Sequence, residues 1–483
     1  MSETFRPFWL QQALAAEQRD PANQGNAPTP LQGDLDVDIC IVGGGYTGLW
    51  TAIMVRQARP DWRIAVIERD LCGAGASGRN GGCMLTWSTK FLSLAQLFGA
   101  AEAARLVQAS EQAVTQIADF CRAHAIDAEV RTAGAVYAAS NDAQVGAIDS
   151  VLQALQKQGI NRWRSVDAAE CESLAGSARM RHGVFTDAAG SVQPARLVRG
   201  LRRVALAMGV AVHEKTSMLE LRQSARPQVQ TGAGCITATQ IVLATNADMA
   251  RQFPQFARDV VLVSSDMVIT EPRPDLVAAI GLDRGQAVCD LRTFVHYWRS
   301  TPDGRLMLGK GGNEIAFGNR MLRRFDQPSR YRSPLQQALQ TFFPALAEVP
   351  IAASWTGASD RSATGFPFFG RLSKHANIFY GFGYSGNGVV QSYLGGSILS
   401  SLLLGADNAW TRSVLTRGPL ASFPPEPVRW CGAMLVRDAI RRKERCEDAG
   451  TAPHAIDRYL SRFARMASKA DEAEKVDAGK QGV

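Results

Sequence analysis

The segment VDICIVGGGYTG, residues 37–48, contains the pattern that decides the fold. Its first half is apolar and rich in β-branched residues, which predicts a strand buried on both faces. Gly43, Gly45 and Gly48 follow with the spacing G-x-G-x-x-G, and apolar residues then recur at helical intervals. Strand, glycine turn and helix in this order predict a phosphate site at the helix N-terminus.

A carboxylate in the next predicted strand supports a dinucleotide as the ligand. Residues 63–67 are predicted to form that strand, and Glu68 follows them directly. An acid at this distance from the glycines accepts hydrogen bonds from the adenosine ribose. A glycine-rich loop without any ligand is the alternative, and the combination of strand, helix and acid argues against it.

Length and composition restrict the class of protein. The chain of 483 residues is too long for one hydrophobic core, so two intertwined domains are expected. None of its nine cysteines forms a C-x-x-C pair, which argues against a zinc site or a disulfide framework and predicts a reducing compartment. The N-terminus has no apolar core of signal-peptide length. We therefore expect a cytoplasmic protein without a metal.

Two features of charge need an interpretation. The net charge is +8, but the densest basic run, residues 437–445, is interrupted by acids and predicts a solvated helix face rather than a nucleic-acid partner. Residues 376–406 carry no charge, yet glycines and polar residues interrupt them. We expect a buried helix after the turn at Gly383–Gly388, not a transmembrane segment.

Three further stretches complete the pattern: GASGRNGG at 75–82, IVLATNA at 241–247 and GFGYSGNGVV at 381–390. With VGGGYTGLWTA they resemble the D-amino-acid-oxidase-like superfamily of FAD-dependent oxidoreductases over residues 36–405. GASGRNGG and YSGNGV resemble the branch that holds γ-glutamylputrescine oxidase. FWL, LWTA and CGAGASGRNGG resemble the aminophosphonate oxidoreductases.

The resemblance implies an α/β protein, α+β overall. It has a Rossmann-like FAD-binding domain and a discontinuous substrate domain with a mixed sheet. The expected parts are an N-terminal arm at 1–35, the FAD-binding domain at 36–100, 186–255 and 350–410, the substrate domain at 101–185 and 256–349, and a C-terminal extension at 411–483. A short helix is expected in the arm near residues 9–17.

The resemblance also implies which residues contact FAD. The first glycine turn binds the pyrophosphate, the second glycine segment runs on to the flavin ring, and the turn at Gly386 brings a helix N-terminus to the flavin pyrimidine, where its dipole stabilises the reduced ring. The implied set is Gly43, Gly45, Tyr46, Thr47, Gly48, Glu68, Arg69, Ser77, Gly78, Arg79, Asn80, Gly81, Gly82, Met218, Ala244, Thr245, Asn246, Gly383, Gly386, Asn387, Gly388 and Val389.

The substrate side is predicted from one hairpin strand. Strand alternation puts His296 and Tyr297 on opposite faces of residues 294–299. His296 or Tyr297 is expected to touch substrate, and Lys310 to be a cation near the flavin. Ordinary sheet packing with a solvated lysine is the alternative for each.

Two positions bear on how closely the chain follows its relatives. Thr364 stands where relatives often carry an acid. Cys83 follows the GRNGG segment near the expected ring, and a buried structural thiol is favoured over covalent attachment.

The expected reaction is oxidation of a small primary or secondary amine, such as an aminophosphonate, a γ-glutamyl amine or an amino acid. Hydride passes to flavin N5, the imine hydrolyses to an aldehyde or keto acid, and oxygen or another acceptor takes the electrons. A flavoprotein dehydrogenase or electron-transfer subunit without amine chemistry is one alternative. A nucleic-acid-modifying flavoprotein is another.

Overall fold

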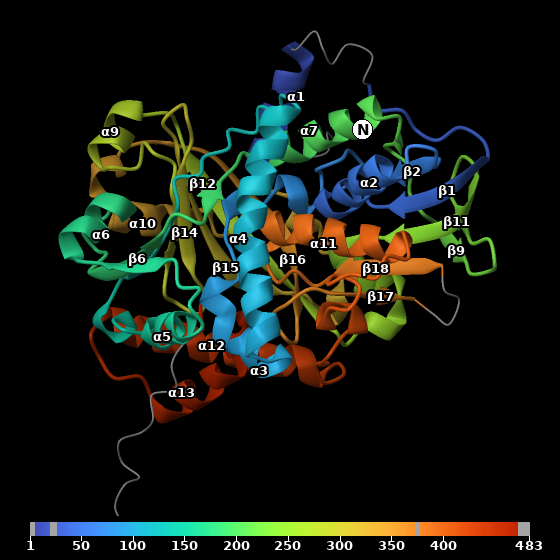
Figure 1. The fold of residues 1–483 in the computed structure, drawn as a ribbon. Coiled ribbons are helices and arrows are strands. Elements are labelled where there is room, and N and C mark those ends of the chain that lie inside the picture. Colours follow the sequence, from blue (N-terminus) through green and yellow to red (C-terminus); the bar gives the residue numbers. More distant parts are fainter. Residues whose placement is uncertain (1–4, 20–26, 373–376, 472–483) are drawn as a thin grey trace, which may run out of the picture.

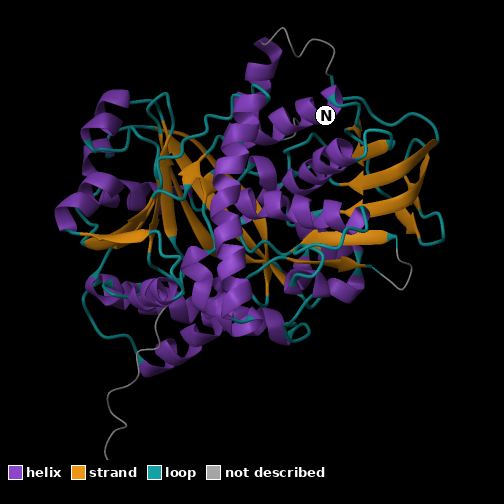
Figure 2. Ribbon diagram, viewed as in Figure 1, coloured by secondary structure: helices purple, strands orange, loops and turns teal. Residues whose placement is uncertain are grey.

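Two mixed sheets of eight strands each form the framework of the molecule (Figure 1, Figure 2). The computed structural model describes residues 5–19, 27–372 and 377–471. Parts of the expected arm and of the expected C-terminal extension therefore lie outside the described residues. The long helix α4 (Ala100–Ala123) crosses in front of the region between the sheets.

The first sheet carries the predicted phosphate-binding unit. Its central strands run parallel in the order β18, β11, β1, β2, β8, with β17 antiparallel at one edge. Val42, the last residue of β1, is paired with Leu243 of β11 and Ile67 of β2. The carboxyl ends of three strands therefore meet at one edge, which brings together the segments that follow them. The strands are β1 (Leu35–Val42), β2 (Ile64–Ile67), β8 (Ala211–His213), β9 (Glu220–Arg222), β10 (Gln228–Gln230), β11 (Cys235–Leu243), β17 (Phe368–Arg371) and β18 (Ile378–Phe382).

Helices cover one face of this sheet and bury it. These are α2 (Tyr46–Ala58), α7 (Pro194–Ala207) and α11 (Gly388–Leu403), with α4 packed on α11. Most of α11 is buried, which explains why the stretch around it lacks charge. Within the part of the chain that the structure describes, no helix has the length and apolar character needed to cross a membrane.

The second sheet has the strand order β16, β12, β15, β14, β13, β4, β6, β5. Neighbouring strands are antiparallel except for β13 and β4. β16 falls in the range expected for the FAD-binding domain, yet it pairs along its length with β12 and so belongs to the second sheet. The strands are β4 (Ala135–Ala139), β5 (Trp163–Val166), β6 (His182–Thr186), β12 (Val260–Thr270), β13 (Ala287–Asp290), β14 (His296–Ser300), β15 (Leu306–Ile315) and β16 (Ile351–Ser362).

Smaller elements complete the second half. α6 (Ala168–Ala175) contacts β4 and β6, and α10 (Arg332–Phe342) contacts β12 and β15. α5 (Asp149–Lys157) and α9 (Pro274–Ala279) lie in the same half of the molecule. Residues 142–144 form a 3-10 turn that precedes α5, with Gly146 at φ +76° between them. The two-stranded pair β3 (Cys83–Met84) and β7 (Gly190–Ser191) joins the second glycine segment to the body.

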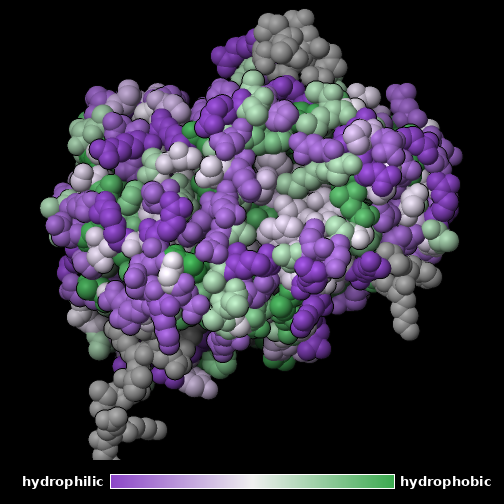
Figure 3. Space-filling model, viewed as in Figure 1, coloured by the Kyte–Doolittle hydropathy of each residue, from purple (hydrophilic) through white to green (hydrophobic). Residues whose placement is uncertain are grey.

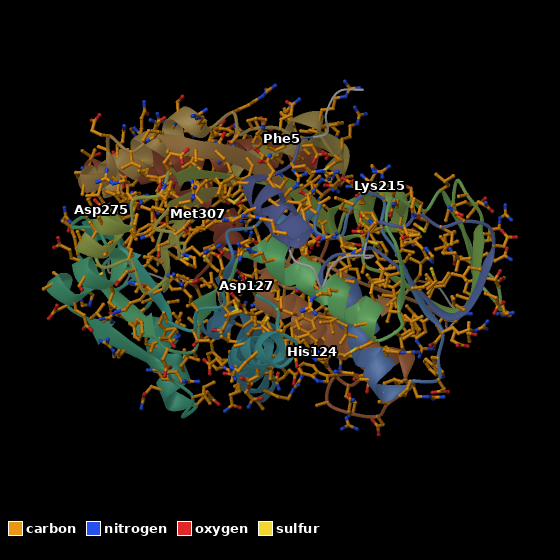
Figure 4. All side chains as sticks on the ribbon, turned by 90° about the horizontal axis from the view of Figure 1, so that it is seen from above. Phe5, His124, Asp127, Lys215, Asp275 and Met307 are labelled. Atoms are coloured by element: carbon orange, nitrogen blue, oxygen red, sulfur yellow. The ribbon has the colours of Figure 1, made fainter. Side chains whose placement is uncertain are left out.

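The N-terminal arm is packed onto the first half of the molecule. Its helix α1 (Phe8–Arg19) contains the helix expected near residues 9–17 and lies on α7, where Glu17 pairs with the buried Arg199. Arg6 and Lys215 both form ion pairs with Asp70. Figure 4 labels Lys215 and Phe5, the residue before Arg6 in the arm. The arm therefore braces the loop that follows Glu68.

The C-terminal extension is packed onto the second sheet. α12 (Val428–Asp448) and α13 (Ala455–Ser461) lie together at one end of the molecule (Figure 1). Arg437 and Arg441 both donate hydrogen bonds to the carbonyl oxygen of Asn313 at the end of β15. The basic run at 437–445 is therefore partly engaged with the protein itself. On the face drawn in Figure 3, hydrophilic and hydrophobic residues are interspersed.

Candidate functional site

A cavity of about 460 Å³ lies between the two sheets. Its walls include the first glycine turn, the second glycine segment, the residues that follow β11, the first half of β12, the second half of β16 and the N-terminus of α11. Of the expected cofactor residues, the cavity is lined by Gly43, Gly45, Tyr46, Thr47, Glu68, Arg69, Ser77, Arg79, Asn80, Gly81, Gly82, Met218, Ala244, Thr245, Asn246, Gly386, Asn387, Gly388 and Val389. The three remaining residues, Gly48, Gly78 and Gly383, lie behind this wall.

The first glycine turn requires glycine for two separate reasons. Gly43 has φ +118°, and a Cβ there would lie 2.5 Å from the carbonyl oxygen of Ala244. Gly48 lies inside α2, where a Cβ would meet the Gly43 carbonyl oxygen at 2.0 Å. The turn can therefore lie close against both neighbouring strands, with the N-terminus of α2 facing the cavity.

Glu68 lies against the turn with its carboxylate partly buried. One oxygen accepts a hydrogen bond from the Gly44 N–H at 2.9 Å, and the other accepts from the Asp70 N–H at 3.0 Å. Burial raises the pKa of Glu68, and these two hydrogen bonds partly offset the effect. Each oxygen keeps a further acceptor position, which suits the hydroxyl groups of a ribose.

The second glycine segment is held by its own polar side chains. Asn80 accepts a hydrogen bond from the Gly82 N–H at 2.8 Å and donates to the carbonyl oxygens of Ala76 and Ser77. Ser77 in turn accepts from the Tyr46 N–H at the start of α2. These residues therefore shape the cavity wall through local hydrogen bonds.

Two arginines of the predicted set have protein partners. The Arg79 guanidinium donates to the carbonyl oxygen of Ala74 at 2.7 Å and pairs with Asp326 at 2.6 Å. Arg69 pairs with Asp248 at 2.5 Å. Both arginines line the cavity, and their charges are balanced by these carboxylates.

Tyr297 is the candidate substrate residue that the cavity contains. Its ring lies in a slot between two glycines, because a Cβ would meet the ring at 2.5 Å from Gly81 and at 2.3 Å from Gly309. Its hydroxyl is 2.9 Å from the Ser265 Oγ. Burial raises the pKa of Tyr297, so the phenol is protonated at neutral pH and can donate a hydrogen bond.

His296 and Lys310 lie away from this cavity. Both line a second cavity of about 560 Å³ next to α12, on the other face of the sheet. The period of two along β14 separates His296 from Tyr297, and Lys310 is paired with His296 across the strands. Nδ1 of His296 is 3.0 Å from Asp290, and Nζ of Lys310 donates to the Phe294 carbonyl oxygen at 2.9 Å. The structure therefore does not bring these two residues to the predicted flavin site.

An acid near α11 was missed by the sequence reasoning. Asp360 on β16 accepts a hydrogen bond from the Gly383 N–H, and the Asn246 amide nitrogen lies 2.8 Å from its carboxylate when oriented to donate. Burial raises the pKa of Asp360 to about 7. Thr364, the residue expected to stand in place of an acid, accepts only a long hydrogen bond from Phe366 and does not line the cavity. The adjacent pair Asp360–Arg361 in an otherwise uncharged strand was the available signal.

Two cations and two thiols lie at the end of the cavity near Tyr297. Arg361 on β16 has a guanidinium nitrogen 3.4 Å from the position of a Cβ on Gly311, and Lys469 reaches the same cavity from the C-terminal extension. Cys83 and Cys289 also line it, and burial raises the pKa of both thiols. Neither cation was singled out from the sequence, because arginines are scattered and Lys469 lies far from every motif.

The donors and shape of the cavity fit FAD. One end combines the N-terminus of α2 with the partly buried Glu68, which suits a pyrophosphate and a ribose. The other end combines the N-terminus of α11 at Gly388 with apolar walls such as Val389, which suits a flavin ring.

Comparisons with known proteins identify the family of this chain and its structural relatives. The chain is 28% identical over 377 residues to γ-glutamylputrescine oxidoreductase of Escherichia coli (strain K12), covering 78% of this chain and 85% of that protein. The crystal structure of glycine oxidase from Geobacillus kaustophilus aligns with a TM-score of 0.66 at 19% identity, over 79% of this chain and 98% of that one. Iminodiacetate oxidase from Chelativorans sp. BNC1 aligns with a TM-score of 0.62 at 18% identity, over 79% and 100%. The family model for FAD dependent oxidoreductases matches residues 38–402, and this chain therefore belongs to that family.

Proposed function

We propose that this FAD-dependent oxidoreductase oxidises a small primary or secondary amine that also carries an anionic group. A carboxylate, a phosphonate or a γ-glutamyl group would serve as the anion. FAD, when bound, supplies the acceptor for the hydride that leaves the carbon next to nitrogen. The resulting imine hydrolyses to an aldehyde or keto acid, and oxygen or another acceptor receives the electrons.

Arg361 is the observation that supports an anionic substrate. Its side chain faces the cavity end that also contains Tyr297, above the side-chain-free surface of Gly311. Burial lowers the pKa of Arg361 only to about 10, so the guanidinium is charged at neutral pH. A planar guanidinium in a low-dielectric cavity binds carboxylate or phosphonate through paired charge-assisted hydrogen bonds.

Tyr297 is proposed to orient the substrate as a hydrogen-bond donor. Its ring is fixed by Gly81 and Gly309, and Ser265 lies within hydrogen-bond distance of its hydroxyl. Because its phenol stays protonated, Tyr297 does not act as a base. Hydride transfer requires the neutral form of the substrate amine, so reduction should accelerate as the pH rises toward the pKa of the amine.

The names of the relatives support the amine half of this proposal. They refer to γ-glutamylputrescine, glycine and iminodiacetate, each of which combines an amine nitrogen with a carboxylate. A flavoprotein that transfers electrons without amine chemistry is the competing proposal. It predicts bound FAD that no amine reduces.

An anaerobic stopped-flow screen tests the proposal at the flavin absorbance. Glycine, sarcosine, γ-glutamylputrescine, 2-aminoethylphosphonate and its N-methyl derivative form the anionic set, and ethylamine and putrescine form the matched set without an anionic group. We expect a member of the anionic set to bleach the flavin faster than the analogue of similar size that lacks the anion. Bleaching by a hydroxy acid or a nicotinamide, with none by any amine, would replace this proposal by the electron-transfer alternative.

A further inference from the structure

The C-terminal extension contributes a side chain to the cavity although it lies outside the family match. That match ends at residue 402, and Lys469 lines the cavity together with Gly386, Asn387 and Gly388. We define residues 468–471 as the strap. It follows α13 and returns the chain from the second sheet to the helix N-terminus at the proposed ring end of FAD.

The strap is anchored to the protein at Lys469 and at Asp471. Asp471 forms a buried ion pair with Lys90 at 2.7 Å and accepts a hydrogen bond from the Ser93 N–H at 2.8 Å. The Asp471 N–H donates to the Thr89 carbonyl oxygen, and the Thr89 hydroxyl donates to the Lys469 carbonyl oxygen, both at 2.8 Å. These contacts hold the backbone of the strap beside the cavity that Lys469 lines.

The Lys469 ammonium lies beside the first residues of α11. It donates to the Gly386 carbonyl oxygen and to Oδ1 of Asn387, both at 2.5 Å. Both acceptors are neutral, and the nearby Arg361 repels the ammonium. Burial together with that repulsion lowers the pKa of Lys469 to about 7, while Cys83, Cys289 and Lys90 are the other titratable groups that influence it. A cation held among positive charges is stabilised by an anion that lies at the same place.

The helix adds its own positive end at this point. α11 is 16 residues long and presents free N–H groups at Gly388 and the residues that follow. We propose that Lys469 is a positioning cation for the flavin, which joins the dipole of α11 in stabilising the negative charge of the reduced ring. This inference rests on the proposed location of the ring at α11, and it assigns a function to the C-terminal extension.

The test measures the flavin itself in the FAD-loaded full chain. Lys469→Gln keeps an N–H donor but removes the charge, and Lys469→Arg keeps the charge. Lys443→Gln is the matched control, because this lysine belongs to the same extension and pairs with Glu447 on α12 at a distance from the cavity. Sulfite affinity and the two-electron reduction potential are measured for each variant, together with FAD content.

We expect Lys469→Gln to retain FAD and to bind sulfite about tenfold more weakly, since an interaction with a charged group is lost. If the reduced flavin ring loses the same tenfold stabilisation, the two-electron reduction potential of the flavin falls by about 30 mV. Lys469→Arg should restore most of both values, and Lys443→Gln should match the natural chain. If Lys469→Gln does not retain FAD, Lys469→Met is measured with the same expectation after reconstitution with excess FAD.

Unchanged sulfite affinity and potential in the charge-removed variants would overturn the inference. A rise in KM for anionic amines with an unchanged potential would also overturn it, because Lys469 would then bind substrate instead. Sulfite and dithionite require no amine. A shifted potential in a protein that no amine reduces would therefore refute the proposed substrate and leave this inference standing.

Discussion

The two ends of the cavity are built in different ways. The cradle, which we define as Gly43–Gly48 with Glu68, comes from one short stretch of chain and consists mainly of backbone. The rim, which we define as Tyr297, Arg361 and Lys469, comes from three distant segments and consists of side chains. The difference teaches that the proposed FAD contacts are encoded locally in this chain, whereas the proposed substrate contacts depend on how the two sheets and the C-terminal extension meet.

Gly48→Val should give the largest effect and tests the cradle. Its new Cβ would lie 2.0 Å from the Gly43 carbonyl oxygen, which is backbone and cannot move aside cheaply. We expect loss of FAD and a fall in the free energy of unfolding of at least about 3 kcal/mol. Gly232→Val is the matched control, because nothing lies within 4 Å of a Cβ there. FAD retention in Gly48→Val at the level of this control would show that the cradle is not tightly packed.

The glycine turn of the cradle could be predicted from the sequence because its requirements are local. A buried strand, three spaced glycines and an acid suffice to predict the turn between β1 and α2, and parallel pairing then brings in Ala244–Asn246. For the rim, the alternation of side chains along a strand placed His296 and Tyr297 on opposite faces of the sheet. The sequence of β14 does not indicate which of these faces lies toward the cofactor. The place of Lys469 in the cavity could not be predicted from the sequence, because it depends on the ion pair that Asp471 forms with the distant Lys90.

The buried Asp360 precedes Arg361 of the rim on β16, and it predicts a pH dependence. Its pKa is about 7 in the folded protein against an ordinary value of 3.8, so the folded protein binds the extra proton between these values. Stability from this group is fully present below about pH 4 and is lost as the pH rises to about 7, by at most about 4 kcal/mol. Asp360→Asn has no carboxyl group to ionise at this position, so its stability does not fall for this reason. Thermal midpoints of the two apoproteins should therefore diverge between about pH 4 and pH 7 in favour of the variant, and parallel curves over this range would contradict the raised pKa.

Arg361→Gln tests whether the rim binds the anionic group of the substrate. Loss of a charge-assisted hydrogen bond costs about 1.5–3 kcal/mol, so KM for an anionic amine should rise by about 10- to 100-fold. KM for an amine without an anionic group should change little, and FAD content should stay the same because the cradle is intact. Arg371→Gln, on an exposed position of β17, is the control. Equal losses for amines with and without the anion would remove Arg361 from substrate recognition.

Glu68→Ala tests the side chain of the cradle that is proposed to bind the ribose of FAD. The substitution removes an acceptor for the ribose and also leaves the Gly44 N–H without its partner. We expect the dissociation constant of FAD to rise by at least about tenfold. Glu220→Ala on the exposed strand β9 should leave FAD binding unchanged. An unaltered constant in Glu68→Ala would mean that the backbone alone binds the cofactor.

Tyr297→Phe should give the smallest effect, and it separates orientation of the substrate from cofactor binding. The ring can remain in its slot between Gly81 and Gly309, while the hydroxyl next to Ser265 is lost. A neutral hydrogen bond contributes about 0.5–1.5 kcal/mol, so kcat/KM should fall by up to about tenfold with an unchanged dissociation constant for FAD. Tyr331→Phe is the matched control, because its hydroxyl donates to the Asn313 carbonyl oxygen at the second cavity. If both variants retain full kcat/KM, the hydroxyl of Tyr297 does not contact the substrate, and Arg361 alone would then orient it at the rim.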